Sequence, residues 1–182
     1  FYNIDSKIEP QSPYGVSKAA AYWLIKIYRE KYNIHCCTGI LFNHESPLRS
    51  KEFVTKKIVD TALKMKKKKS LKLELGNVDI YRDWGWAPDY VEAIWLMMQR
   101  NKPRDFIIGS GKTYSLKEFV NEVFRYLKLD KKNLKTNVSK YKRKIDLRGY
   151  KANITDTQKK LKWKPKLKFK TIIHKMINNE LF

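Results

Sequence analysis

The strongest constraint in the sequence is a long amphipathic segment that leads directly into a short, continuous apolar run. Ser12-Pro13 is a helix-start signal, because a capping hydroxyl precedes a proline in the first turn. Apolar residues then recur three and four positions apart, which predicts a helix over 13–31. Residues 34–43, IHCCTGILFN, are typical of a fully buried parallel strand. A helix followed by such a strand is one unit of a doubly wound α/β sheet.

Shorter patterns predict a smaller mixed α/β part that is built from the rest of the chain. Helical spacing occurs at 53–65, 91–98, 116–127, 156–161 and 172–177, and Ser115 with Glu118 forms a capping box. Extended segments are predicted at 71–75, 80–84 and 105–109, the last of them in the main sheet. Residues 128–151 are basic and match no regular pattern.

The positive charge is concentrated in three segments of an otherwise neutral chain. The formal net charge is +22, and residues 64–72, 131–151 and 159–175 hold 23 of the 40 lysines and arginines but one acidic residue. This pattern leaves a nucleic-acid-binding module open as an alternative. Solvated lysines on loops and helix faces also explain it, and so does an anionic small substrate, which needs only a few of these cations. The sequence contains no apolar stretch long enough for a transmembrane helix. We interpret Cys36 and Cys37 as reduced core residues of a cytoplasmic protein.

Tyr14 and Lys18 are the candidate chemical pair of the first helix. They are four residues apart and therefore lie on the same helix face. A lysine ammonium stabilises a neighbouring phenolate, so the pair is able to accept a proton from an alcohol during hydride transfer. The alternative is an exposed tyrosine and lysine with no chemical role.

Six short motifs follow one another along the chain: SPYGVSKAAAYW, LFNHESP, FVTKK, YRDWGWAPDYVEAIW, FIIGSG and KLKWKP. In this order they resemble the sugar-nucleotide branch of the extended short-chain dehydrogenases. LFNHESP and RDWG narrow the resemblance to the GDP-mannose 4,6-dehydratase family and its GDP-heptose relatives. The resemblance implies a Rossmann-type sheet in which residues 1–47 end the NADP-binding domain. Residues 48–182 then form mainly the GDP-sugar-binding domain, with 85–110 returning to the sheet.

The resemblance also implies roles for individual residues. Tyr14 corresponds to the catalytic tyrosine, and Lys18 to its partner, which also holds the nicotinamide ribose of NADP. His44 and Arg49 correspond to further NADP contacts. The implied contacts to the GDP-sugar are Asn43, Lys57, Arg82, Arg143 and Asp146. The last two stand in an Arg-Lys-Ile-Asp string where the family has Arg-Pro-Thr-Glu, so that Asp146 replaces the family's glutamate.

The implied reaction converts GDP-D-mannose into GDP-4-keto-6-deoxy-D-mannose and water by internal hydride transfer through NADP. The family's glycine-rich phosphate turn, and its catalytic threonine and glutamate, have no counterpart in these 182 residues. We therefore expect a back-half fragment that is inactive alone. We expect no metal, no nucleic-acid partner and no membrane partner. The whole enzyme is expected to be a homodimer or a homotetramer. A GDP-heptose 4,6-dehydratase and a GDP-4-keto-6-deoxy-sugar reductase of the same fold remain alternatives.

Overall fold

The computed structural model describes residues 2–141 and 149–181 of the chain. Its elements are, in order, α1 (Pro13–Tyr32), β1 (Gly39–Leu41), β2 (Asn43–Glu45), α2 (Val54–Lys67), β3 (Leu73–Glu74), β4 (Tyr81–Arg82), β5 (Trp84–Trp86), α3 (Ala87–Met98), β6 (Phe106–Ile108), β7 (Tyr114–Ser115), α4 (Leu116–Leu127), the 3₁₀ turn η1 (Lys131–Asn133), β8 (Leu134–Lys135), the 3₁₀ turn η2 (Ser139–Tyr141), α5 (Thr155–Leu161) and α6 (Phe169–Asn178).

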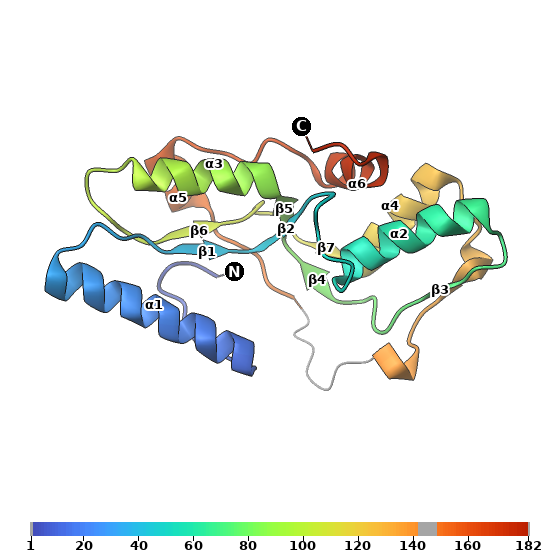
Figure 1. Cartoon of the computed structure of the whole chain (residues 1–182), viewed down its shortest axis with the longest axis horizontal. Coiled ribbons are helices and arrows are strands. Elements are labelled where there is room, and N and C mark those ends of the chain that lie inside the picture. Colours follow the sequence, from blue (N-terminus) through green and yellow to red (C-terminus); the bar gives the residue numbers. More distant parts are fainter. Residues whose placement is uncertain (1, 142–148, 182) are drawn as a thin grey trace.

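The strands pair mostly in parallel, as an α/β fold requires. β1 pairs with β6, β2 with β5 and β3 with β8, all in parallel, whereas β4 and β7 are antiparallel. Figure 1 shows α1 on one face of the β1–β6 pair and α3 with α5 on the other. Helices on both faces of a parallel sheet are the arrangement of a doubly wound fold, which confirms the predicted fold class.

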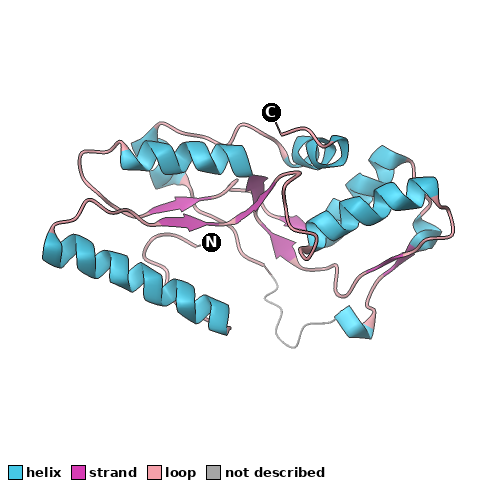
Figure 2. Cartoon of the chain, viewed as in Figure 1, coloured by secondary structure: helices cyan, strands magenta, loops and turns pink. Residues whose placement is uncertain are grey.

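The largest core lies at the other end of the long axis, where α2, α4 and α6 pack together (Figure 2). Aromatic rings bind these helices to the strands: Trp84 of β5 stacks on Phe169 of α6 at 5.9 Å between ring centroids. A second cluster joins α3, β6 and the Trp163 side chain. None of the helices in the described ranges is both long and apolar enough to cross a membrane.

All six predicted helices are confirmed, and so are the two predicted start signals. The Ser12 hydroxyl accepts the Gly15 N–H at the start of α1, and Ser115 and Glu118 form the expected capping box of α4. The predicted strand over 34–43 is wrong in extent, because only Gly39–Leu41 pairs with β6. The partner changes at Phe42: its N–H still donates to Ile108 of β6, but Asn43 already pairs with Trp84 of β5.

The burial predicted for this first unit is also wrong. No residue of α1 is buried, and its predicted apolar stripe, including Val16, Trp23 and Ile27, is exposed. In the described part of the chain, α1 meets a sheet of only two strands, which offers too little surface to cover that stripe. Cys36 and Cys37 are free thiols, as predicted, but both are only half-buried, and Cys37 packs against the edge of the second cluster.

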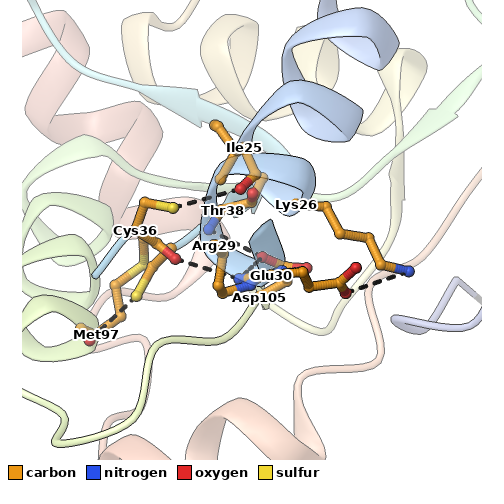
Figure 3. Close-up of polar contacts among 9 residues, drawn as sticks. Ile25, Lys26, Arg29, Glu30, Cys36, Thr38, Met97 and Asp105 are labelled. Carbon is orange, nitrogen blue, oxygen red and sulfur yellow. Dashed lines mark hydrogen bonds and ion pairs between the residues drawn. The ribbon is translucent and has the colours of Figure 1, made fainter. Parts of the chain in front are cut away.

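The ion pair of Arg29 and Asp105 fastens the C-terminal part of α1 to the sheet (Figure 3). Both guanidinium NH₂ groups donate to the carboxylate, at 2.7 and 2.8 Å, and the Arg29 side chain also donates to the Cys36 carbonyl. The Thr38 N–H donates to the same carboxylate at 3.1 Å. Burial by itself would raise the pKa of Asp105, but the Arg29 and Thr38 contacts outweigh it and lower that pKa. In the folded chain, Asp105 is therefore ionised and paired with Arg29.

We expect Arg29→Met to lower the free energy of unfolding by about 2–4 kcal/mol, since it leaves a largely buried carboxylate without its cation. Lys26→Met is the matched control, because the Lys26–Glu30 pair on the same helix is solvent-exposed and 4.0 Å long. Its loss should change stability by less than about 0.5 kcal/mol. Urea unfolding at neutral pH measures both variants. Equal effects of the two substitutions would show that the Arg29–Asp105 pair does not anchor α1.

Candidate functional site

One cavity of about 920 Å³ is lined by side chains from the start of α1 and from the β1–β2 segment. Residues of the N-terminal segment 2–11 and Tyr150 also line it. Four predicted site residues line it: Tyr14, Asn43, His44 and Arg49. The walls are completed by apolar and aromatic side chains, among them Phe42, Ile107 and Tyr150. The cavity thus combines a phenol, an imidazole, a guanidinium and an amide with an apolar lining, which is the usual composition of a ligand site.

Tyr14 enters this cavity from the first turn of α1. Proline at the first helical position and the Ser12 cap set where the helix begins, and so fix the direction of the Tyr14 side chain. Tyr14 is 71% exposed, and the Lys18 ammonium lies 5.4 Å from the centroid of its ring. The predicted pair therefore does share one helix face, and Tyr14 is open to a ligand.

Asn43 and His44 are positioned by the pairing of β2 with β5. The buried Tyr90 hydroxyl donates to the Asn43 main-chain carbonyl at 3.2 Å, and burial raises the pKa of Tyr90, which keeps this phenol protonated. Gly85, opposite His44 in the register, leaves room for Tyr90, since a Cβ there would overlap the Tyr90 ring. The His44 Nδ1 lies 3.0 Å from the Phe42 carbonyl, so Nδ1 carries the hydrogen and Nε2 is the acceptor of the neutral ring.

Arg49 is held between a buried carboxylate and an aromatic ring. Its guanidinium carbon lies 3.7 Å from the centroid of Phe53, and its Nε lies 3.6 Å from Glu45, too long for a hydrogen bond. Glu45 is 1% exposed and accepts the Thr55 hydroxyl at 2.8 Å. Burial raises the pKa of Glu45 to about 7 against the lowering effects of Arg49 and Thr55. Arg49 therefore has its cationic group in the cavity with a weakly acidic neighbour behind it.

Arg82 and Asp83 of the RDWG motif are both buried. The Asp83 carboxylate accepts the backbone N–H groups of Ser110, Gly111 and Ala152 at 2.7, 2.9 and 3.3 Å. Arg82 donates to the Tyr81 carbonyl, and its guanidinium lies 4.9 Å from the ring centroid of Tyr150. Asp83 thus has a structural role, and Arg82 borders the cavity through Tyr150.

Lys57 does not line the cavity. Its ammonium donates to the Glu74 carbonyl at 3.1 Å and lies 3.6 Å from the ring centroid of Tyr141. Arg143 and Asp146 lie outside the described residues. In the described ranges, the structure therefore gathers four predicted residues in one cavity, whereas Lys18, Lys57 and Arg82 are not among the residues that line it.

Sequence reasoning missed three residues that shape this site: Glu45, Tyr90 and Tyr150. Glu45 lies in the motif LFNHESP, and Tyr90 lies in YRDWGWAPDYVEAIW. The available signal for Glu45 was an acidic residue four positions before the cationic Arg49. Tyr150 carries no local signal, because it lies in the basic stretch 128–151, which matches no regular pattern. No group of three or more His, Cys, Asp or Glu side chains able to hold a metal ion occurs within 2–141 and 149–181.

Comparison with known proteins points to one family. The family described as GDP-mannose 4,6 dehydratase matches residues 2–176. GDP-mannose 4,6 dehydratase 1 of Arabidopsis thaliana is 41% identical over 172 residues, which cover 94% of this chain and 48% of the plant protein. The chain thus spans about half the length of the curated relatives it matches.

Solved structures confirm the fold. A dTDP-glucose 4,6-dehydratase from Bacillus anthracis in complex with NAD superimposes with a TM-score of 0.87 at 23% identity, over 97% of this chain and 54% of that one. RMD from Pseudomonas aeruginosa, complexed with NADPH, gives a TM-score of 0.88 at 18% identity, over 99% of this chain and 59% of that one. At these identities the likeness concerns the fold alone.

The raised pKa of Glu45 predicts a pH-dependent stability. Between the usual value of 4.5 and about 7, the unfolded chain releases a proton that the folded chain retains, so stability falls as pH rises through this window. Glu45→Gln cannot ionise, and its stability relative to the wild type should increase by roughly 2–3 kcal/mol between pH 4.5 and pH 8. Denaturant unfolding of both proteins across this range measures the effect. A difference that does not change with pH would mean that Glu45 ionises equally readily in both states.

Proposed function

Because the chain belongs to the GDP-mannose 4,6-dehydratase family, we propose that it forms the tyrosine-bearing, GDP-sugar-binding part of an NADP-dependent GDP-mannose 4,6-dehydratase. The reaction proposed is the conversion of GDP-D-mannose into GDP-4-keto-6-deoxy-D-mannose and water, a hydro-lyase reaction.

One observation carries the proposal. The same cavity holds Tyr14 from α1 and Asn43, His44 and Arg49 from the segment after β1. Tyr14 stands in the motif SPYGVSK, Asn43 and His44 stand in LFNHESP, and Arg49 follows that second motif by two residues. Their meeting in one cavity is what a joint role in binding and chemistry requires. A surface composed of solvated residues would not bring a phenol, an imidazole and a guanidinium to one apolar-walled cavity.

The cavity residues suit a dinucleotide with a nicotinamide end. Arg49 offers a planar cation for phosphate, His44 a ring nitrogen acceptor, and the apolar wall of Phe42 and Ile107 a surface for an aromatic ring. When bound, NADP would accept a hydride from the sugar and give it back later in the reaction. The glycine-rich turn that holds the pyrophosphate has no match in this sequence, so that contact has to come from elsewhere.

Tyr14 is the proton acceptor in this proposal. Its phenolic oxygen takes the proton of the sugar C4 hydroxyl, and the Lys18 ammonium lies on the same helix face, 5.4 Å from the centroid of the Tyr14 ring. Asn43 and Arg82 contact the sugar nucleotide, the amide by hydrogen bonds and the guanidinium by charge. Lys57, Arg143 and Asp146 keep their proposed nucleotide contacts from the family resemblance alone.

A chimaera tests the proposed function. The front half of the Arabidopsis relative, fused before this chain, should convert GDP-mannose without added NADPH, whereas the 182-residue chain alone should show no turnover. Product is identified by mass spectrometry and by reduction of the 4-keto group. A soluble, folded chimaera without turnover of GDP-mannose but with turnover of GDP-heptose would move the assignment to that relative. A requirement for NADPH and a keto-sugar substrate would move it to the reductase.

Tyr14→Phe in this chimaera should lower kcat by about 10²–10⁴-fold, the usual contribution of a positioned acid or base. The ring is kept, so KM for GDP-mannose should stay close to that of the parent. Tyr28→Phe, on the exposed side of the same helix, is the control. If Tyr14→Phe kept a normal kcat, another group would be the proton acceptor.

The cations near the site should matter, and the lysine run should not. Arg82→Met should weaken GDP-mannose binding by about 1.5–3 kcal/mol, the range for a hydrogen bond to a charged group. Replacing Lys66, Lys67, Lys68 and Lys69 with Gln removes four charges from an exposed segment at the end of α2 and should change binding little. Calorimetric titration of GDP-mannose into each of the two variants, at physiological salt, measures both changes in binding. Equal losses would mean that diffuse positive charge, and not the cavity, binds the nucleotide.

A further inference from the structure

Tyr150 connects two residues that are far apart in the sequence and that both belong to the proposed sugar-nucleotide site. Its hydroxyl donates to the Asn43 side-chain oxygen at 3.2 Å, across 107 positions of the chain. The face of its ring lies 4.9 Å from the Arg82 guanidinium. Tyr150 also lines the cavity itself. One side chain therefore touches both an amide and a cation to which the family resemblance gives substrate contacts.

The ring of Tyr150 is held in a defined orientation. Phe42 and Tyr2 pack against it edge-on, at 5.6 and 6.3 Å between ring centroids. The backbone around it is fixed as well, since Gly149 bridges to Tyr81, and a Cβ at Gly149 would come within 2.7 Å of the Tyr81 Cβ. On the other side, the Tyr2 N–H donates to the Lys151 carbonyl at 2.9 Å. Tyr150 is thus a fixed element against which other side chains are aligned.

The contact with Asn43 decides how that amide faces a ligand. An amide oxygen that accepts the Tyr150 hydroxyl directs the NH₂ group of Asn43 the other way, as a donor. The Asn43 main-chain carbonyl is already occupied by Tyr90, so the residue is held at both its backbone and its side chain. The contact with Arg82 acts similarly, since a cation over an aromatic face is restrained without losing its capacity to donate.

We infer that Tyr150 is a positioning residue of the sugar-nucleotide site: its hydroxyl orients the Asn43 amide and its ring holds the Arg82 guanidinium. This inference rests on the proposed function for the part that Asn43 and Arg82 play in binding. The orienting contacts themselves do not depend on that function, so the two are separable by experiment.

The test compares Tyr150→Phe, which removes the hydroxyl and keeps the ring, with Tyr150→Leu, which removes both. Tyr126→Phe is the matched control, because the Tyr126 hydroxyl also donates to an asparagine oxygen, that of Asn178, at 3.1 Å and outside the cavity. The 182-residue chain is used for all measurements. NMR follows the side-chain amide signals of Asn43 and the Nε–H signal of Arg82 in the free protein, and urea unfolding measures the stability of each variant.

We expect Tyr150→Phe to shift the Asn43 amide signals and leave the Arg82 signal nearly in place, and Tyr150→Leu to shift both. Titration with GDP-mannose should then show about 3- to 10-fold weaker binding for Tyr150→Phe. The loss for Tyr150→Leu should be about 10- to 100-fold. Tyr126→Phe should alter neither the signals nor the binding, even where it lowers the urea midpoint.

Unchanged Asn43 and Arg82 signals in both Tyr150 variants would overturn the inference, whatever happens to stability. So would shifted signals with GDP-mannose affinities equal to that of the wild type. If neither the wild-type chain nor the chimaera described above bound GDP-mannose, the proposed function would fail, and the NMR signals would still decide whether Tyr150 positions the two side chains.

Discussion

The buried carboxylate of Asp83 is the constraint on which the middle of the molecule depends. A carboxylate that is fully removed from water is stable only when its oxygens are satisfied, and here three backbone N–H groups do this. Two of the donors follow β6, and the third, Ala152, lies two residues after Tyr150. One side chain between β4 and β5 therefore draws together the sheet and the segment that carries Tyr150. The RDWG motif acts as a structural junction as well as a source of the Arg82 cation.

The helix that carries Tyr14 depends on a different interaction. Because α1 buries none of its residues, apolar packing contributes little to holding it against β1 and β6. The bidentate Arg29–Asp105 pair supplies the directional contact near its C-terminal end, while Ser12 and Pro13 set its start. Tyr14 is thus placed at the free end of a helix that is fastened at the opposite end. Such an end is suited to a residue that meets a ligand, since the Tyr14 side chain is largely exposed there.

Local patterns predicted what depends on neighbouring residues and failed where distant segments decide. The helical periodicity of 116–127 and its capping box are confirmed residue by residue in α4. The extent of the strand in 34–43 depends instead on which strand lies beside it, and that changes at Phe42 from β6 to β5. The site shows the same division. Motif residues such as Asn43 and His44 do meet in one cavity, whereas Tyr150 gains its importance from a partner 107 positions away.

The cations of this chain differ in how they are held, and this separates candidate ligand contacts from bulk charge. Three cations, Arg49, Lys57 and Arg82, lie over aromatic rings. The distance from the charged group to the ring centroid is 3.7 Å for Arg49 and Phe53, 3.6 Å for Lys57 and Tyr141, and 4.9 Å for Arg82 and Tyr150. A ring under a cation is not sufficient by itself, since the exposed Arg104 also lies near Phe106. The three differ from Arg104 in being at least partly withdrawn from water, where an aromatic face restrains the side chain before a ligand arrives. Binding a phosphate then costs less side-chain entropy than it would for the exposed lysines at the end of α2. The large net charge of the chain raises the electrostatic potential around it, and the few restrained cations determine where a phosphate binds.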